Sequence, residues 1–221
     1  EFFASRNGAA RGYVSLPEMV SDPDVDVVAL CTPVNQHAEQ GIQAAQAGKH
    51  VWAEIPMEAT VAAAEALVEG CRKAGVKLGV GFEHRFHPAH IEMRRLIAAG
   101  EIGKVAFAEA RFSIPSEGGL IGGQTYWKIP PRPVVEYSLR KWTEDPKNRG
   151  GNAVAHLGFV LDILRFLLGC EVKEVTALTD VADDPQGREH KVAALLNFEG
   201  DIYTLAFGSH ECPYDDNSIA V

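Results

Sequence analysis

Apolar residues along the first hundred positions follow two different spacings. Short apolar runs of strand length alternate with segments whose apolar residues recur at helical spacing, at 37–48 and 60–75. The strand candidates are VDVVALCT (25–32), KHVWAEI (49–55) and VKLGVGFE (76–83). This order predicts a βαβαβ unit with a parallel sheet and right-handed crossovers. Thr60 fits a helix N-cap, and Gly48 and Gly75 fit positions just past helix ends.

The pattern changes after a further helical segment at 90–103. A strand-like run begins at Lys104, and a second apolar helix is expected near 151–169. Three strand-like runs then follow with only turn residues between them: EVKEVTALTD (171–180), HKVAALLNFEG (190–200) and DIYTLAFGSHEC (201–212). Such runs favour an antiparallel sheet. We therefore predict an α/β chain in which a parallel-sheet domain (1–103) precedes an α+β domain with an open, mainly antiparallel sheet (104–221).

Composition narrows the possible partners. The 221 residues include 30 acidic and 21 basic side chains, which give a formal charge of −9 without a run of like charge. A nucleic-acid surface or a membrane-surface helix is therefore not expected. No apolar stretch reaches the ~18 residues of a membrane span. Four cysteines (Cys31, Cys71, Cys170 and Cys212) are scattered and form no CxxC, which favours a reducing cytoplasm over a disulfide framework or zinc site.

Candidate chemistry gathers where the predicted parallel strands end. The first strand is followed by Thr32, Pro33, Asn35 and His37, and the second by Glu54, Ile55 and Pro56. Carboxyl ends of neighbouring parallel strands lie at one sheet edge, where ligands of open α/β folds bind. The helix that begins there would also attract phosphate or carboxylate. The alternative is that these residues only end the strands and begin the helix.

Three histidines follow the third strand in GVGFEHRFHPAH. His84, His87 and His90 suggest a metal site, but their spacing crosses a turn and a proline-initiated helix, and no HExxH motif is present. We expect no metal. The long loop at 115–133, rich in Gly and Pro, either serves a site or is disordered; its Tyr126 and Trp127 favour order.

Four segments in sequence order carry a family resemblance over nearly the whole chain: DPDVDVVALCTPVNQHAEQ, AGKHVWAEIPM, GVGFEHRFHPAH with LIAAGEIGKV, and WTEDPKNRGGNAVAHLGFVLDILRFLLG. Together they resemble the oxidoreductases named after glucose-fructose oxidoreductase, inositol 2-dehydrogenase and the rhizopine-catabolism dehydrogenase (Gfo/Idh/MocA). The resemblance implies a Rossmann domain that binds NAD or NADP. It also implies a second domain that supports a small-molecule substrate and, through its open sheet, a homo-oligomer, either a dimer or a tetramer.

The sequence departs from the family pattern at its catalytic positions. Family members carry Glu-Lys-Pro where this chain has Glu54-Ile55-Pro56, so the lysine that assists proton transfer is missing. His156 stands at the family's Asp position and Val160 at its His position. Imidazole titrates near neutral pH, so His156 becomes the first candidate for proton transfer, although a histidine on an apolar helix is often a core residue. The segment before Asp162 is one residue short, which makes Asp162 the second candidate.

The resemblance also implies where ligands bind. The cofactor wall is expected to comprise the two strand ends and Arg85, with His84, Tyr126, Trp127 and Lys128 as substrate contacts. The Glu-Ile-Pro variant is similar to family members that oxidise a carboxy-hydroxymuconate semialdehyde as a cyclic hemiacetal. We therefore expect hydride transfer from a hydroxyl or hemiacetal carbon of a sugar-like or ring-cleavage substrate. The alternatives are a non-catalytic nucleotide sensor and an inactive fragment.

The two ends of the sequence lack features that the family pattern requires. The expected glycine-rich turn is missing because the chain begins too late, and GGLIGG at 118–123 lies in the wrong domain. The last residues, NSIAV, stop inside a strand pattern. We therefore expect both domains to be incomplete and the chain to be a piece of a longer open reading frame.

Overall fold

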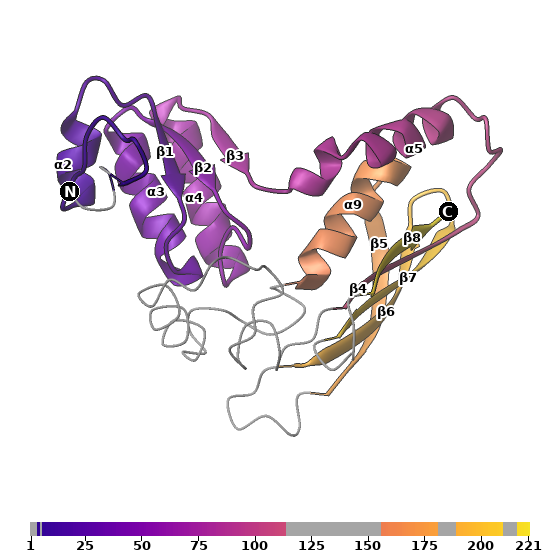
Figure 1. Cartoon of the computed structure of the whole chain (residues 1–221). Coiled ribbons are helices and arrows are strands. Elements are labelled where there is room, and N and C mark those ends of the chain that lie inside the picture. Colours follow the sequence, from indigo (N-terminus) through magenta and orange to yellow (C-terminus); the bar gives the residue numbers. More distant parts are fainter. Residues whose placement is uncertain (1–3, 5, 114–155, 181–188, 210–215) are drawn as a thin grey trace. The chain divides into compact units, whose positions relative to one another are not determined.

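The computed structural model describes residue 4 and residues 6–113, 156–180, 189–209 and 216–221 (Figure 1). The chain divides into two compact units, Glu1–Gly81 and Phe82–Val221. The division falls earlier than the expected join near Gly103. The helix α5 (Pro88–Ala98) lies in the second unit because it packs against α9 (Gly158–Leu168).

The first unit is a parallel sheet with helical crossovers, as predicted. Its strand order is β1-β2-β3, and both neighbouring pairs run parallel. The strands are β1 (Val27–Leu30), β2 (His50–Ala53) and β3 (Leu78–Val80). The helical elements are α2 (Leu16–Ser21), the short 3₁₀ turn η1 (Val34–Gln36), α3 (His37–Gln46) and α4 (Val61–Ala74).

Local signals explain where the helices of the first unit begin and end. The Thr60 hydroxyl accepts a hydrogen bond from the amide of Ala63 at 3.2 Å, and Gly75 adopts the left-handed conformation at the end of α4 (φ 70°). Both caps were predicted. The helix α2 was not, although Ser15 caps it by accepting from the Glu18 amide and a proline stands in its first turn.

Close packing at Gly41 brings α3 onto the sheet and onto α4. A Cβ atom at Gly41 would lie 2.5 Å from Leu67 Cδ1 and 3.1 Å from Leu30 Cδ1. Any larger residue would therefore require the ends of these leucine side chains to shift within the buried apolar cluster that joins β1, β2, α3 and α4. The glycine thus allows α3 to pack closely on the sheet and on α4.

The second unit contains a five-stranded sheet in the order β5-β6-β7-β4-β8. Its strands are β4 (Phe107–Ser113), β5 (Val172–Thr179), β6 (Lys191–Phe198), β7 (Ile202–Ser209) and β8 (Asp216–Ala220). The pairs β5–β6, β6–β7 and β4–β8 are antiparallel, which confirms the mainly antiparallel sheet. The pair β4–β7 is parallel, which the sequence pattern did not predict.

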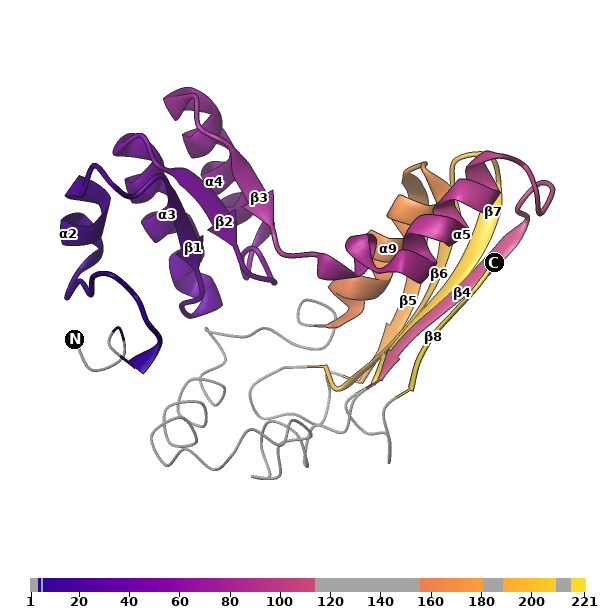
Figure 2. The ribbon, with the colours of Figure 1, turned by 45° about the horizontal axis from the view of Figure 1, so that its top comes forward.

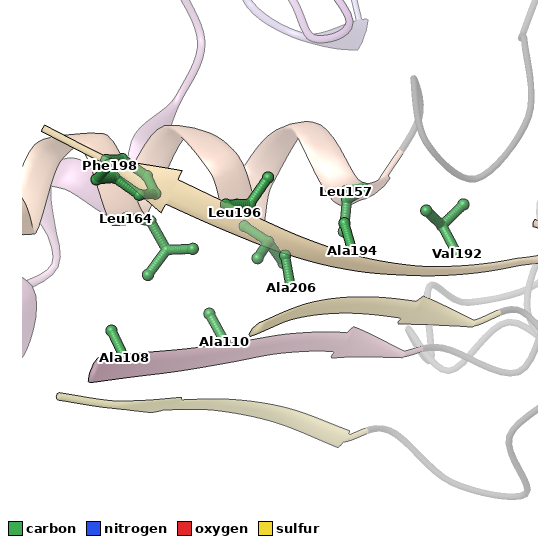
Figure 3. Packing of buried hydrophobic residues seen from close by; sticks show 10 residues of the cluster. Ala108, Ala110, Leu157, Leu164, Val192, Ala194, Leu196, Phe198 and Ala206 are labelled. Carbon is green, nitrogen blue, oxygen red and sulfur yellow. The ribbon is translucent and has the colours of Figure 1, made fainter. Parts of the chain in front are cut away.

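Helices cover one face of this sheet. Leu157 and the apolar side chains of α9 pack against alternate residues of β4, β6 and β7; Figure 3 shows Leu164 on the helix side of Ala108 and Ala110, and Leu157 beside Ala194. Figure 2 shows α5 and α9 on the same side of the strands. The helix α9 continues a wide turn that begins at His156. Residues 151–155, where the helix was also expected, lie outside the described part.

The opposite face of the sheet carries exposed apolar side chains. Register places Leu195 opposite Leu205 and Phe107 opposite Tyr203 on this face. We call this set the outer sheet face; its large apolar members are Phe107, Leu178, Leu195, Tyr203, Leu205 and Phe207. Within the described segments, no helix is long and apolar enough to cross a membrane.

Candidate functional site

The structure brings the two predicted strand ends together at one edge of the first sheet. Leu30 and Ala53 are register partners at the ends of β1 and β2. The Glu54 amide donates to the Leu30 carbonyl at 3.1 Å, and the Gly81 amide donates to the Ala53 carbonyl at 2.9 Å. The segments that follow all three parallel strands are therefore tied to one another by backbone hydrogen bonds.

His37 links these segments from the first turn of α3. Its side chain is only 1% exposed, its Nε2 lies 2.9 Å from the Thr32 carbonyl oxygen, and its Nδ1 lies 3.1 Å from that of Met57. A neutral imidazole donates from one nitrogen, so only a protonated ring can donate to both carbonyls at once. The sequence predicted a direct cofactor contact for His37. The buried ring is instead committed to the two loops that surround it.

Glu58 occupies the N-terminal end of α3. One carboxylate oxygen accepts from the Ala38 amide at 2.8 Å and the other accepts from the Ala59 amide at 2.9 Å. The sequence predicted a phosphate or carboxylate at this helix end, and the structure places the chain's own carboxylate there. Sequence reasoning missed Glu58 because its distance from α3 along the chain gives no sign that the two meet.

Thr32, Pro33 and Asn35 line the beginning of the loop after β1. The Thr32 hydroxyl donates to Gln40 Oε1 at 2.6 Å, and Gln40 Nε2 donates to Gln36 Oε1 at 2.9 Å. Thr32 and Pro33 are half-buried and Asn35 is exposed. The hydroxyl of Thr32 is therefore oriented by a glutamine from the facing helix, a partner that was not predicted.

The loop after β2 presents a carboxylate. Glu54 is exposed, whereas Ile55 and Pro56 are half-buried and joined by a cis peptide bond. A Cβ atom at Gly81 would lie 3.1 Å from Glu54 Oε2, so the glycine leaves room for this carboxylate beside the end of β3. Burial, followed by the negative charge of Glu54, raises the pKa of the neighbouring Cys31 thiol.

In the second unit, Arg85 and Asp162 form a two-pronged ion pair. Arg85 Nε donates to Asp162 Oδ2 at 2.7 Å, and a terminal nitrogen of Arg85 donates to Oδ1. Asp162 is buried at 7% exposure, whereas the Arg85 side chain is 38% exposed. The hydrogen bonds that Arg85 donates to Asp162 raise the pKa of the Arg85 guanidinium. The aspartate predicted as catalytic therefore orients the arginine predicted to bind cofactor.

A row of stacked rings contains the other predicted residues of this unit. His156, 8% exposed, stacks on Phe112 at 5.5 Å between ring centroids and 12° between ring planes. Phe112 stacks on Phe159 at 5.1 Å and 8°, and Phe159 meets His84 at 5.1 Å and 40°. The structure thus places the candidate base and one candidate substrate contact in a single ring cluster.

Some predictions cannot be placed in this way. Tyr126, Trp127 and Lys128 lie outside the described residues. Among the residues that are described, no group of three histidine, cysteine or acidic side chains is arranged to hold a metal ion. The rings of the three histidines after β3 lie side by side, with His84 and His90 centroids 6.0 Å apart and those of His87 and His90 5.3 Å apart.

Two family models match the chain in succession. The model for the oxidoreductase family with an NAD-binding Rossmann fold matches residues 1–82, and the GFO/IDH/MocA C-terminal domain model matches residues 90–221. The two matches leave only a short segment at 83–89 between them. The order agrees with a parallel α/β unit followed by a unit built on an open sheet.

Named relatives agree with these matches. A 1,5-anhydro-D-fructose reductase from Ensifer adhaerens is 31% identical over 202 residues, 90% of this chain and 55% of the relative. A 4-carboxy-2-hydroxymuconate-6-semialdehyde dehydrogenase from a Sphingobium species is 41% identical over 99 residues, 45% of this chain and 31% of the relative. This chain thus spans about half the length, or less, of these relatives.

A solved structure supports the fold over almost the whole chain. The crystal structure of a putative myo-inositol dehydrogenase from Sinorhizobium meliloti superimposes with a TM-score of 0.77 at 27% identity. The match covers 98% of this chain and 60% of that one. The arrangement of elements within each unit is therefore that of a known dehydrogenase fold.

Proposed function

The chain belongs to the Gfo/Idh/MocA family of oxidoreductases. On this basis we propose that it functions as an NAD(P)-dependent dehydrogenase. The reaction is hydride transfer from a hydroxyl or hemiacetal carbon of a sugar-like or ring-cleavage substrate. The names of relatives that act on 1,5-anhydro-D-fructose, on D-xylose and on a muconate semialdehyde support this range of substrates. NAD(P) supplies the hydride acceptor when it is bound.

The observation that carries the proposal is the edge of the first sheet, where β1 and β2 end side by side. His37 and Glu58 hold the two loops at this edge through hydrogen bonds to backbone groups. The carboxyl ends of neighbouring parallel strands are the usual ligand position in open α/β folds. The groups that remain for a ligand there are the exposed Asn35 and Glu54 and the half-buried Thr32, Pro33, Ile55 and Pro56.

The chemistry of this edge fits the nicotinamide end of the cofactor. Oxidised nicotinamide carries a positive ring, which the Glu54 carboxylate would attract. The half-buried Ile55 and Pro56 offer an apolar surface for a flat ring. A phosphate group fits less well, because Glu58 already occupies the N-terminus of α3 and Glu54 would repel it.

The second unit contributes the proposed proton-transfer and substrate groups. His156 accepts the hydroxyl proton, and the ring stack with Phe112 fixes the plane of its imidazole. Asp162 acts by holding Arg85, whose guanidinium can bind a cofactor or substrate oxygen. His84 is proposed as a substrate contact, together with Tyr126, Trp127 and Lys128 outside the described residues.

We also propose a homo-oligomer, a dimer or tetramer, formed through the outer sheet face. Its large apolar side chains lie on adjacent strands and are exposed in the single chain, with Leu178 77% exposed and Tyr203 50% exposed. A continuous apolar face of this kind favours association. A reducing cytoplasmic location is consistent with the free thiols of Cys31, Cys71 and Cys170.

Nucleotide titration tests the proposed reaction. We expect the chain to bind NAD(P)H saturably, and the fluorescence of the reduced nucleotide measures this binding. The substitution Glu54→Gln keeps the shape of the side chain and removes its charge. It should weaken binding of the oxidised nucleotide about two- to fivefold more than that of the reduced form, since a partly exposed charge pair is worth ~1 kcal/mol or less.

The matched control is Glu65→Gln on the exposed face of α4, which should leave both affinities unchanged. Absence of saturable binding of either nucleotide by the unsubstituted chain would contradict the proposal. If Glu54→Gln weakens binding of the oxidised and the reduced nucleotide equally, then Glu54 does not contact the nicotinamide ring. The proposal that the chain binds the nucleotide would still stand.

A further inference from the structure

A cavity of about 330 Å³ lies within the second unit, between the start of α5, the face of α9 and the β4–β8 edge of the sheet. Its volume is within the range of small-molecule pockets, ~300–1,000 Å³. The side chains on which the argument rests are His84, His87, His90, Met93, Phe112 and Phe159. All of them belong to the second unit, and none lies at the nucleotide edge of the first.

The walls of this cavity are largely apolar and include flat rings. Besides the histidines, the polar lining consists of Ser218 and Arg111, whose guanidinium donates to Glu109 at 2.6 Å. The rings of Phe112 and Phe159 are nearly parallel, at 8° with centroids 5.1 Å apart, and the thioether of Met93 lies in the same lining. Phe112 also stacks on His156, so a ligand contacts the parts of these rings that line the cavity; such aromatic and sulfur contacts favour a flat ring over a puckered one.

Two histidines at the cavity have defined hydrogen-bonding roles. His87 caps α5, and its Nδ1 accepts from the Ala89 amide at 3.3 Å, so a neutral His87 carries its hydrogen on Nε2. His90 Nδ1 faces the His84 carbonyl oxygen at 2.7 Å and must donate to it, so the Nε2 of a neutral His90 is an acceptor. The two rings, 5.3 Å apart, therefore offer one donor and one acceptor.

The chemistry of the ligand follows from this pairing. A hydroxyl group accepts and donates, so it matches one donor beside one acceptor. An ammonium group only donates and a carboxylate only accepts. No acidic side chain is present among the described residues that line the cavity, which leaves a cationic ligand without a counter-charge.

We infer that the cavity binds a small flat ring bearing a hydroxyl group. The ring lies against Phe112 and Phe159, and the hydroxyl accepts from His87 and donates to His90. His84 is also a proposed substrate contact, so this inference rests on the proposed function and narrows its ligand class, although binding of the ring requires neither nucleotide nor turnover. Its test is therefore independent of nucleotide titration.

The chain contains only three methionines, which makes a simple reporter. With ¹³C-methyl methionine, phenol should shift the Met93 signal saturably, while Met19 and Met57 of the first unit stay in place. Toluene lacks the hydroxyl and cyclohexanol lacks the flat ring. Cyclohexanol, which loses the stacking contact, should bind roughly three- to tenfold more weakly than phenol, and toluene, which loses both hydrogen bonds of the hydroxyl, should bind at least as weakly as cyclohexanol.

The substitution His87→Asn removes the Nε2 donor while keeping a residue that caps helices well. It should weaken phenol binding by a similar factor. The matched control is His50→Asn in the first unit, where the ring accepts from the Lys77 amide; phenol binding should be unchanged. The inference is overturned if phenol fails to shift Met93, if all three probes bind equally, or if His87→Asn binds phenol as well as the unsubstituted chain.

Discussion

The sheet edge of the first unit and the ring cluster of the second use histidine in opposite ways. At the edge, both ring nitrogens of His37 face backbone carbonyls and the side chain is almost fully buried. In the cluster, His84 is packed largely by its ring face, and His87 and His90 each use only one nitrogen in a described backbone contact. The first arrangement fixes the backbone, whereas the second leaves polar ring edges beside a cavity.

This difference shows that the type of residue says little about its role until its partners are known. A histidine whose nitrogens are committed to carbonyls acts on a ligand only through the loops that it holds. A histidine packed by its faces keeps donor or acceptor capacity for a ligand. The comparison therefore separates a positioning role for His37 from ligand contact by the histidines of the second unit.

The largest expected effect comes from removing the His37 ring. His37→Ala removes the buried ring whose nitrogens face the Thr32 and Met57 carbonyl oxygens and opens a cavity, so we expect the first unit to lose about 2–4 kcal/mol of stability. Urea unfolding followed through the Met19 methyl signal measures this loss. The same change at the exposed His87 removes one helix cap and should cost the second unit about 1 kcal/mol, followed through Met93.

Similar losses at the two positions would break the comparison, because His37 would then contribute no more than an exposed cap. If His37→Ala lowers the stability strongly but leaves the affinity of the folded protein for reduced nucleotide unchanged, then His37 contributes only to stability. If both the stability and the affinity fall, His37 also positions the edge of the first sheet where the nucleotide is proposed to bind.

A smaller effect is expected from the ion pair of the second unit. Asp162→Asn keeps the shape of the side chain but removes the charge that holds Arg85, and should lower stability by about 1–2 kcal/mol. The value lies between those of buried and surface pairs because the Arg85 side chain is 38% exposed. The control is Glu171→Gln, which breaks the exposed pair with Arg165 and should leave the free energy of unfolding nearly unchanged.

The smallest effect concerns acid stability of the first unit. The hydrogen bond from Tyr13 at 2.7 Å, the Asp24 amide and Arg11 lower the pKa of Asp22 from 3.8 to about 2. This contribution is complete above pH ~4 and is lost as pH falls toward 2, since the unfolded chain binds the proton more tightly. Tyr13→Phe removes the main cause. It should move acid unfolding, followed by circular dichroism, to slightly higher pH; an unchanged midpoint would contradict the assignment.

Local signals made most of the fold predictable. Thr60 and Gly75 mark α4 through interactions within a few residues, and the alternation along β6 shows directly in its buried and exposed residues. The partners of His37 and the position of Glu58 were not predictable, because they lie across a loop that no spacing rule describes. Adjacency of Thr32 and Glu54 was predictable, since parallel strands end at one edge.

The pairing of Arg85 with Asp162 was missed for the same reason. The two residues stand 77 positions apart, and nothing in either segment indicates that the guanidinium and the carboxylate meet. The resemblance to a family identified both as site residues but not as partners. Long-range side-chain pairs require the tertiary structure.

The position of β4 in its sheet has a consequence for synthesis on the ribosome. β4 is the first described strand of the second unit, yet it lies between β7 and β8, the last two strands among the described residues. Its first residue, Phe107, pairs with Tyr203 almost a hundred positions later. The nascent chain therefore holds β4 without its β7 partner until the segment around Tyr203 has emerged, while the local βαβαβ pattern of the first unit can fold as it appears. A strand whose partner comes so late, with two phenylalanines and with alanines that face the core, is where chaperone binding during translation should concentrate.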